Sequence, residues 1–338
     1  MNMINNTTID NNVVPYESLT PDVVLDSLEQ QGYLCNGHLL ALNSYENRVY
    51  QIGLDSGDYL IAKFYRPGRW SDDTILEEHE FSLELASYDL PVITPLPDSN
   101  NNTLFHFAGF RFALFPRSGG RAPELDNPEH LKILGRLMGR IHSIAAIKPF
   151  HDRPKLTLER FGIEALAYLL DNECIAPEVR FNFEVAANDV LSLCEQQLAV
   201  NSHIRQIRLH GDCHPGNILW TDTGAHFVDL DDCQTGPAIQ DLWMFLSGTP
   251  GEMESQLVLL LNEYTRFFDF DPSELALIET LRSLRLIHYN AWLARRWSDP
   301  AFPLHFPWFD SPRYWEEQLI TLREQIERMG EPTLRWPV

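Results

Sequence analysis

Short apolar runs divided by polar turns dominate the first third of the chain. Residues 39–42, 48–52 and 59–65 are rich in aliphatic, β-branched and aromatic side chains, and turn formers separate them. After a further polar loop, residues 105–107 and 110–115 show the same character. Runs of this length between turns predict the strands of an antiparallel sheet.

Two helices are predicted beside this sheet. Thr20 followed by Pro21 has the character of an N-cap and a first helical position, and Gly32 is a natural end for that helix. The second and main helix is predicted from Ser71 to about Tyr88. We expect residues 1–19 to form a mobile N-terminal tail.

Beyond Asn127 the pattern changes to apolar positions three and four residues apart, which predicts helices. We expect these helices at 131–141, 156–170, 178–198, 251–268, 272–296 and 312–328. The aromatic-rich segment 297–314 is expected to pack on this helical part. The chain is therefore predicted to be α+β and bilobal, with a small antiparallel-sheet lobe over 20–115, a hinge at 113–116 and a large, mostly helical lobe over 116–338.

A polar loop interrupts the helical pattern between two short strands expected at residues 204–209 and 226–230. The loop carries Asp212 and Asn217, and Asp229 closes the second strand. This layout puts two carboxylates and an amide at the mouth of a small hairpin. On a kinase-like scaffold, phosphoryl transfer needs one carboxylate to orient the attacking hydroxyl, and an amide with a second carboxylate to hold magnesium. The sequence therefore predicts a phosphotransfer site carried by the large lobe.

Two other interpretations of this loop are open. Asp and Asn beside Pro215 and Gly216 are common turn formers, so turn chemistry alone accounts for each of them taken singly. His210 and His214 are spaced like the ligands of a two-histidine metal site. That second interpretation leaves Asn217 without a role, whereas the kinase interpretation uses it.

The small lobe supplies candidates for nucleotide contacts. Lys63 lies inside a predicted strand among apolar residues, where a lysine is either a solvated edge residue or has a buried anionic partner. In a kinase this lysine meets a helix glutamate, and we expect Glu78 in that role, with Glu77 as the second choice. No glycine-rich motif lies near the first turn, so Ser44 and Asn47 are the expected phosphate contacts of a polar lid.

Composition narrows the class of protein. A chain of 338 residues exceeds the size at which a single core stops growing, which agrees with two lobes. No apolar run reaches the ~18–20 residues needed to span a bilayer, and the N-terminus lacks the pattern of a signal peptide, so we expect a cytoplasmic protein that uses no membrane. A net charge of −22 argues against nucleic-acid binding. It favours cationic partners, or is simply a solvated surface.

Five cysteines are spread along the chain without a Cys-x-x-Cys pair, which argues against a disulfide framework or a structural zinc site. Cys213 and Cys233 each follow an acidic residue of the predicted site. The plain interpretation is that they are small apolar fillers. The alternative is a redox role, against which the neighbouring carboxylates argue because negative charge raises the pKa of a thiol.

Five motifs of the chain form a recognisable set: Asn43-Ser44-Tyr45-Glu46-Asn47, Lys63-Phe64-Tyr65-Arg66-Pro67, Ile75-Leu76-Glu77-Glu78-His79, His210-Gly211-Asp212-Cys213-His214-Pro215-Gly216-Asn217 and Val228-Asp229-Leu230-Asp231-Asp232. Together they resemble the aminoglycoside phosphotransferase and choline kinase branch of the protein-kinase-like superfamily. The resemblance extends from about residue 20 to 328. It implies a bilobal kinase-like fold that uses ATP and Mg²⁺.

The resemblance also implies roles for single residues. Asp212 would orient the acceptor hydroxyl and accept its proton, while Asn217 and Asp229 would hold magnesium. Ser44 would contact ATP from the lid, and Lys63, held by Glu78, would bind the α- and β-phosphates. Asp241 is expected to be a structural acceptor that fixes the catalytic loop, and Asp231 and Asp232 to be supporting or strand-end carboxylates.

Members of this kind resemble cytoplasmic serine/threonine kinases that act during stress, so we expect a monomer that takes a protein substrate. The motifs support equally a small-molecule kinase acting on an amino alcohol, sugar or antibiotic hydroxyl. A nucleotide-binding regulator with little catalysis is a third hypothesis, against which the intact Asp212, Asn217, Asp229 and Lys63 argue. The chain lacks the glycine-rich lid, the His-Arg-Asp loop, the Asp-Phe-Gly motif and the Ala-Pro-Glu end of eukaryotic-type kinases.

Overall fold

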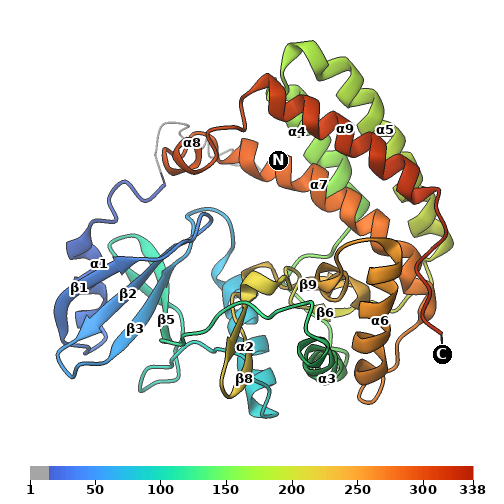
Figure 1. The fold of residues 1–338 in the computed structure, drawn as a ribbon. Coiled ribbons are helices and arrows are strands. Elements are labelled where there is room, and N and C mark those ends of the chain that lie inside the picture. Colours follow the sequence, from blue (N-terminus) through green and yellow to red (C-terminus); the bar gives the residue numbers. More distant parts are fainter. Residues whose placement is uncertain (1–14, 338) are drawn as a thin grey trace, which may run out of the picture.

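The predicted strands of the first third form one antiparallel sheet with the order β1-β2-β3-β5-β4. A computed structural model describes residues 15–337, and Figure 1 shows this sheet at one end of the molecule. The strands are β1 Cys35–Ala41, β2 Arg48–Leu54, β3 Tyr59–Phe64, β4 Phe105–Phe107 and β5 Phe110–Pro116. Lys63 pairs with Val49 on one side and Ala113 on the other, which places it in the centre of the sheet.

Helix α1 (Pro21–Gln30) begins as expected, with the Thr20 side chain accepting from the N–H of Val23. Its buried residues join the core of the sheet. The expected mobile tail is wrong for its last residues, because Tyr16 and Leu19 are buried in this core. The Tyr16 hydroxyl donates to the carbonyl oxygen of Phe64. Residues 1–14 lie outside the described part of the chain.

Helix α2 (Asp72–Ser87) connects the two lobes (Figure 1). Its first half packs through Ile75 against the sheet. Its second half contributes Phe81 and Leu85 to the main core of the large lobe. The chain that follows stays on the large lobe, where the N–H of Ile93 donates to the carbonyl oxygen of Phe227. The boundary of the apolar cores therefore runs through α2.

The large lobe is mostly helical, as predicted. Its main elements are α3 Pro128–Ala145, the π-helix η1 Glu159–Ile163, α4 Glu164–Asp171, α5 Pro177–Val200, α6 Pro250–Tyr264, the 3₁₀ helix η6 Pro272–Leu277, α7 Ile278–Arg295, α8 Ala301–His305 and α9 Pro312–Met329. Two expected helices are thus each divided in two, at the junctions η1–α4 and η6–α7. Within the described residues, no helix has the length and apolarity needed to cross a bilayer.

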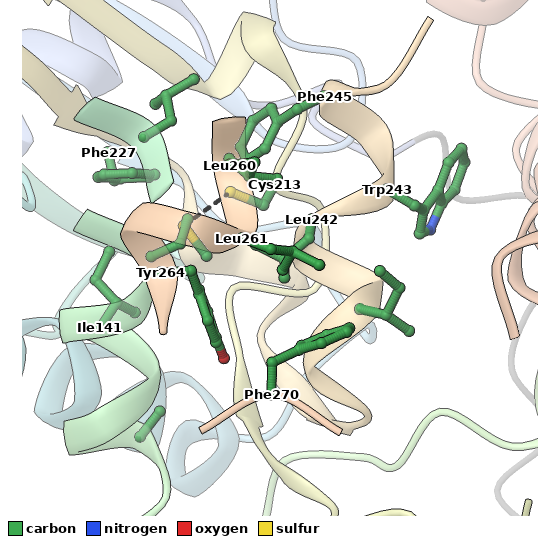
Figure 2. Packing of buried hydrophobic residues seen from close by; sticks show 14 of the residues in the cluster. Ile141, Cys213, Phe227, Leu242, Trp243, Phe245, Leu260, Leu261, Tyr264 and Phe270 are labelled. Atoms are coloured by element: carbon green, nitrogen blue, oxygen red, sulfur yellow. Dashed lines mark hydrogen bonds between the residues drawn. The ribbon is translucent and has the colours of Figure 1, made fainter. Parts of the chain in front are cut away.

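The helices form two packed groups, one around α3 and α6 and one around α4, α5, α7 and α9. In the first group, Gly135 and Gly139 let α3 approach the backbone of α6 so closely that a Cβ atom would overlap the carbonyl oxygens of Leu260 and Tyr264. Figure 2 shows apolar side chains of this group, including Cys213 from the predicted catalytic loop, residues 210–217. The loop that carries the candidate chemistry is therefore anchored through Cys213 in the core beside α3, where Cys213 contacts Met138.

The strands around the catalytic loop differ from the prediction. The strand expected at 204–209 is limited to β6 (Ile207–Leu209), and it pairs with β9 (Gln234–Gly236). The strand expected at 226–230 is β8 (Gly224–Phe227), which pairs with β7 (Ile218–Thr221). Two small ribbons therefore replace the single expected hairpin. The hinge expected at 113–116 is the last part of β5, which ends at Pro116.

Candidate active site

The backbone of the catalytic loop is fixed by a buried carboxylate. Asp241 accepts the N–H of His210 at 2.7 Å and the N–H of Gly211 at 2.8 Å, and it also contacts His142 Nε2 at 3.2 Å. Gly211 has φ +86°, and a Cβ there would overlap the carbonyl oxygen of Asp232. The expected structural role of Asp241 agrees with this geometry, because it holds the loop that leads into Asp212.

Asp212 lies at the surface of this loop, with 23% of its side chain exposed. Its Oδ1 is 2.6 Å from Arg285 Nη1, and its Oδ2 is 3.5 Å from His214 Nε2. Burial raises the pKa of Asp212, but the His214 hydrogen bond and the Arg285 charge outweigh it and hold the pKa well below its usual range. Asp212 is therefore ionised at neutral pH.

The two histidines of the loop do not converge on a metal position. His210 Nε2 donates to the carbonyl oxygen of Val228 at 2.9 Å. His214 Nδ1 accepts the N–H of Gly216 at 2.9 Å, which assigns the proton to Nε2 on the Asp212 side. Across residues 15–337, no three His, Cys, Asp or Glu side chains are grouped so as to hold a metal ion. The two-histidine hydrolase interpretation therefore has no support in the geometry.

Asn217 and Asp229 are brought together by the β7–β8 ribbon. The N–H of Val228 donates to the carbonyl oxygen of Asn217 at 3.0 Å, directly before Asp229. Asp229 was expected to close a strand, but β8 ends at Phe227 and Asp229 has a left-handed backbone conformation (φ 59°, ψ 67°). This conformation is uncommon for a non-glycine residue and turns the side chain out of the ribbon, where 52% of it is exposed.

The donor set suits a divalent ion that is shared with phosphates. Asn217 Nδ2 donates to the carbonyl oxygen of Asp212 at 3.0 Å, which leaves its Oδ1 as the atom able to face an ion. Asp229 adds a carboxylate. Hard divalent ions in phosphotransfer sites are commonly bound by one or two protein oxygen ligands together with substrate phosphates and water. The residues present therefore fit such an ion, although they would not enclose it alone.

Lys63 and Glu78 form the expected ion pair, with Nζ 3.3 Å from Oε1. Lys63 Nζ also lies 3.0 Å from Asp229 Oδ1 and 3.3 Å from Asp231 Oδ1. Burial lowers the pKa of Lys63, but these three carboxylates outweigh it and keep the ammonium charged. Burial raises the pKa of Glu78 above its usual range, against the effect of Lys63.

Glu77, the second choice for this pair, has a different partner. Its carboxylate accepts the backbone N–H groups of His151, Asp152 and Arg153 at 2.6–2.8 Å. It therefore ties α2 to the segment after α3 and does not meet Lys63. Since neighbouring helical positions point about 100° apart, only one of these two glutamates is able to face the sheet.

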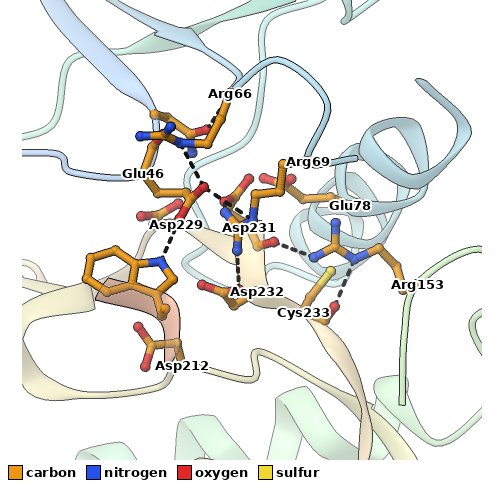
Figure 3. Close-up of polar contacts among 12 residues, drawn as sticks. Glu46, Arg66, Arg69, Glu78, Arg153, Asp212, Asp229, Asp231, Asp232 and Cys233 are labelled. Atoms are coloured by element: carbon orange, nitrogen blue, oxygen red, sulfur yellow. Dashed lines mark hydrogen bonds and ion pairs between the residues drawn. The ribbon is translucent and has the colours of Figure 1, made fainter. Parts of the chain in front are cut away.

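Two arginines that sequence reasoning missed hold the segment after Asp229 (Figure 3). Arg69 forms ion pairs with Asp231 and Asp232. Arg153 donates from Nε to the carbonyl oxygen of Cys233 at 2.8 Å and also hydrogen-bonds the carbonyl oxygen of Asp231. Asp231 and Asp232 thus support the site by fixing the turn that displays Asp229.

The turn between β1 and β2, expected as a nucleotide lid, is docked on the large lobe. Glu46 accepts the Trp292 Nε1–H at 2.6 Å and pairs with Arg296 at 2.5 Å. Tyr45 packs against Phe306 with ring centroids 4.8 Å apart. Segment 297–314 packs on the large lobe, as expected, with Phe302, Phe306 and Phe309 in its core, and through Phe306 it also contacts the lid.

The two candidate lid residues differ in their surroundings. Asn47 is buried, with 3% exposed, and its Oδ1 accepts the N–H of Arg66 at 3.1 Å. Ser44 is partly exposed and makes no protein hydrogen bond within the described range. The Ser44 hydroxyl is therefore available to a ligand, whereas the Asn47 side chain is used to support the loop.

Cys213 and Cys233 point into the core, and both are fully buried. Cys213 Sγ lies 3.8 Å from Met138 Sδ. Burial, with Asp241 and Asp212 adding to it, raises the pKa of the Cys213 thiol, and burial raises that of Cys233. The apolar-filler interpretation agrees with these positions.

A charged lysine, an amide–carboxylate pair suited to a divalent ion and an ionised aspartate are the features expected of an ATP-dependent phosphotransferase with a kinase-like fold. Residues 38–278 match the model of the Phosphotransferase enzyme family. Stress response kinase A of Escherichia coli O157:H7 is 43% identical over 331 residues, which are 97% of this chain and 98% of that protein. The chain therefore belongs to the phosphotransferase enzyme family and, within it, to the group of stress response kinase A.

Two further comparisons agree. The Serine/threonine protein kinase RdoA of Salmonella typhimurium is 42% identical over 327 residues, with 97% of this chain and 98% of that protein covered. The structure of amicoumacin kinase hAmiN in complex with AMP-PNP, Ca²⁺ and Ami shares the fold, with a TM-score of 0.69 at 19% identity over 92% of this chain and 94% of the other.

Proposed function

We propose that this chain is a magnesium-dependent serine/threonine protein kinase that acts in the bacterial stress response. The observation that supports a protein substrate is the 42% identity, over nearly the full length, to a relative named as a serine/threonine protein kinase. The proposal places the enzyme in the cytoplasm as a monomer that draws on the cellular pool of Mg-ATP.

In this proposal Asp212 orients the serine or threonine hydroxyl and accepts its proton. Because its pKa is held low, it is a weak base, so its main contribution is to position the hydroxyl for a loose transition state, with proton transfer late. His214 and Asn217 hold the Asp212 carboxylate and backbone in place through the contacts described above.

Lys63, held by Glu78, contacts the α- and β-phosphates, and Ser44 contacts phosphate oxygens from the lid. Asn217 and Asp229 hold the ion. When bound, Mg²⁺ supplies charge that offsets the negative phosphate oxygens in the transition state. At about 4 Å and an effective dielectric constant of about 20, each such ion contact contributes roughly 4 kcal/mol before desolvation.

A second candidate function is a small-molecule kinase. The supporting observation is that a structural neighbour with the same fold is named amicoumacin kinase and was solved in complex with AMP-PNP, Ca²⁺ and Ami. That likeness is at 19% identity, whereas the relatives named as stress response or protein kinases are above 40%. Identity in this range favours the protein kinase proposal.

Transfer of labelled phosphate tests the proposal. Purified full-length protein is incubated with γ-labelled ATP and Mg²⁺, against generic protein substrates and a panel of hydroxylated amines, sugars and antibiotics. We expect acid-stable phosphoserine or phosphothreonine on protein, and loss of signal in Asp212→Asn. Transfer to a metabolite with none to protein would instead support the second candidate.

A further inference from the structure

Two arginines of the large lobe, Arg285 and Arg160, lie near the proposed site, in a chain whose net charge is −22. Arg285 projects from α7 onto Asp212, with 41% of its side chain exposed. Arg160 comes from the π-helix η1 and is partly buried. A π-helical turn is rare and frequently occurs at functional sites. The two arginines therefore come from two separate elements of the large lobe, α7 and η1.

Arg160 is not neutralised by the protein. Across residues 15–337, no carboxylate oxygen lies within 4.0 Å of its guanidinium. Its guanidinium lies 5.7 Å from the centre of the Trp70 ring, which also contacts Arg153 at 4.6 Å. Burial lowers the pKa of Arg160, and Arg69 and Arg153 add to this effect, while Asp232 opposes it. A partly buried arginine without an anionic partner is costly unless a ligand supplies the charge.

The two arginines are connected through His288 of α7. His288 packs on Phe161, the neighbour of Arg160, with ring centroids 4.3 Å apart. Its Nδ1 is buried and has no hydrogen-bond partner in the described structure. The positive charges of Arg160 and Arg285 reach it, and burial together with these and neighbouring arginines lowers the pKa of His288 to about 3. A histidine with this pKa is neutral at pH 7. The rim formed by Arg160, His288 and Arg285 therefore carries two charges: Arg160, whose guanidinium lies 5.4 Å from the centre of the Phe161 ring, and Arg285, which contacts Asp212.

We propose that this rim binds an anionic group of the acceptor, so that the preferred substrate is a serine or threonine flanked by acidic residues. The inference rests on the proposed protein kinase function. Arg285 would also release the carboxylate of Asp212 from its ion pair when the substrate binds. It contacts Asp212 directly, and an acidic side chain of the substrate would share its guanidinium and free Asp212 for the hydroxyl. A basic substrate would be repelled and would leave the Arg285–Asp212 pair intact.

Three peptides of equal length test this inference. Each carries one central serine, and the flanking positions are glutamate, alanine or lysine. With γ-labelled ATP and Mg²⁺, we expect kcat/KM to fall about tenfold from the acidic to the neutral peptide and again to the basic one. An equal or reversed order would overturn this inference alone. Absence of transfer to all three peptides would overturn both it and the proposed protein kinase function.

Variants of the rim locate the effect. We expect Arg160→Gln to raise the KM for the acidic peptide about tenfold with little change in the KM for ATP. Arg160→Glu should invert the order toward the basic peptide, and Arg160→Lys should restore most of the acidic preference. Arg313→Gln is the matched control, because Arg313 is an exposed arginine of α9 paired with Glu317. An unchanged order of peptides in Arg160→Glu would overturn the inference.

Discussion

Trp292 donates its indole N–H to the carboxylate of Glu46 at 2.6 Å, so a side chain of helix α7 holds the turn between β1 and β2. The two residues belong to different lobes. Because the turn is the proposed nucleotide lid, its conformation depends on a helix that follows the catalytic loop by many residues.

Loss of this contact should weaken nucleotide binding. A hydrogen bond to a charged group contributes about 1.5–3 kcal/mol, and Trp292→Phe removes the donor while keeping an aromatic ring. The lid must then be ordered when ATP binds, so we expect Kd for Mg-ATP to rise about tenfold and hydrogen exchange at residues 42–47 to accelerate. Calorimetry and exchange mass spectrometry measure both. Trp308→Phe is the control, and equal behaviour of the two variants would contradict the prediction.

The two aspartates of the site should separate catalysis from binding. Asp212→Asn should lower kcat by about 10²–10⁴-fold, the range for a positioned general base, and leave Mg-ATP binding largely intact. Asp229→Asn should also lose the dependence of nucleotide binding on Mg²⁺, because it removes a proposed ion ligand. Titrations with and without Mg²⁺ distinguish them. Near-normal turnover of Asp212→Asn would disprove its assignment.

Glu77 and Glu78 are neighbours on α2 but should behave differently. Glu78→Gln leaves Lys63 to Asp229 and Asp231, so we expect kcat/KM for ATP to fall about 10- to 100-fold with a modest change in stability. Glu77→Gln weakens a carboxylate that accepts three backbone N–H groups, so it should lower unfolding stability by about 1–3 kcal/mol and spare the kinetics of the folded protein. The opposite pattern in paired kinetic and denaturant measurements would show that the roles are exchanged.

Cys213 and Cys233 should not act as redox switches. Both thiols are buried and their pKa values are raised, so the reactive thiolate is scarce. Mild peroxide should leave activity unchanged, and Cys213→Ser and Cys233→Ser should remain active, with a stability loss of about 1–3 kcal/mol from a buried hydroxyl. Rapid inhibition that is reversed by a reductant and is absent from either variant would refute this prediction.

Glu274 should make stability depend on pH. It is buried, with Oε2 2.8 Å from the N–H of Ile239, and burial raises its pKa from 4.5 to about 7. The folded state therefore binds more protons than the unfolded state between about pH 4.5 and 7, and stability falls as pH rises through this window. Glu274→Gln should reduce the difference in unfolding midpoint between pH 5 and pH 8. Glu316→Gln, at an exposed position of α9, should not.

The sequence carried most of the information about the sheet lobe and the catalytic loop. Periodicity placed the strands around Lys63, and Asp212 and Asn217 lie close together along the chain, so their spacing was visible. The pairing of the short strands could not be predicted, because the runs at 204–209 and 226–230 contain no signal that selects a partner strand. Each pairs with a strand that the pattern had not predicted.

The contacts made by α7 also could not be predicted from the sequence. Arg285 and Trp292 lie on a helix whose spacing predicts only burial, and Arg296 caps its C-terminal end. Their partners Asp212 and Glu46 are distant in the chain. Ion pairs have no period, so neither composition nor spacing indicates which carboxylate an arginine meets. The sequence also gives no sign that Arg69 pairs with Asp231. Each of them, however, lies in or beside a recognisable motif, so the pair could have been suggested by the closeness of these motifs in a kinase-like fold.

Helix α2 limits which segments of this protein could be exchanged with those of a relative in a chimera. Phe81 and Leu85 belong to the core of the large lobe, while Ile75 belongs to the sheet. A chimera that takes residues 20–115 from one relative and the remainder from another would join two unmatched halves of a packed interface. An exchange that keeps α2 with the helical lobe preserves the contacts of Phe81 and Leu85, but the new strands must then match Ile75. A whole lobe is therefore not a segment that relatives could exchange without disturbing the packing of α2.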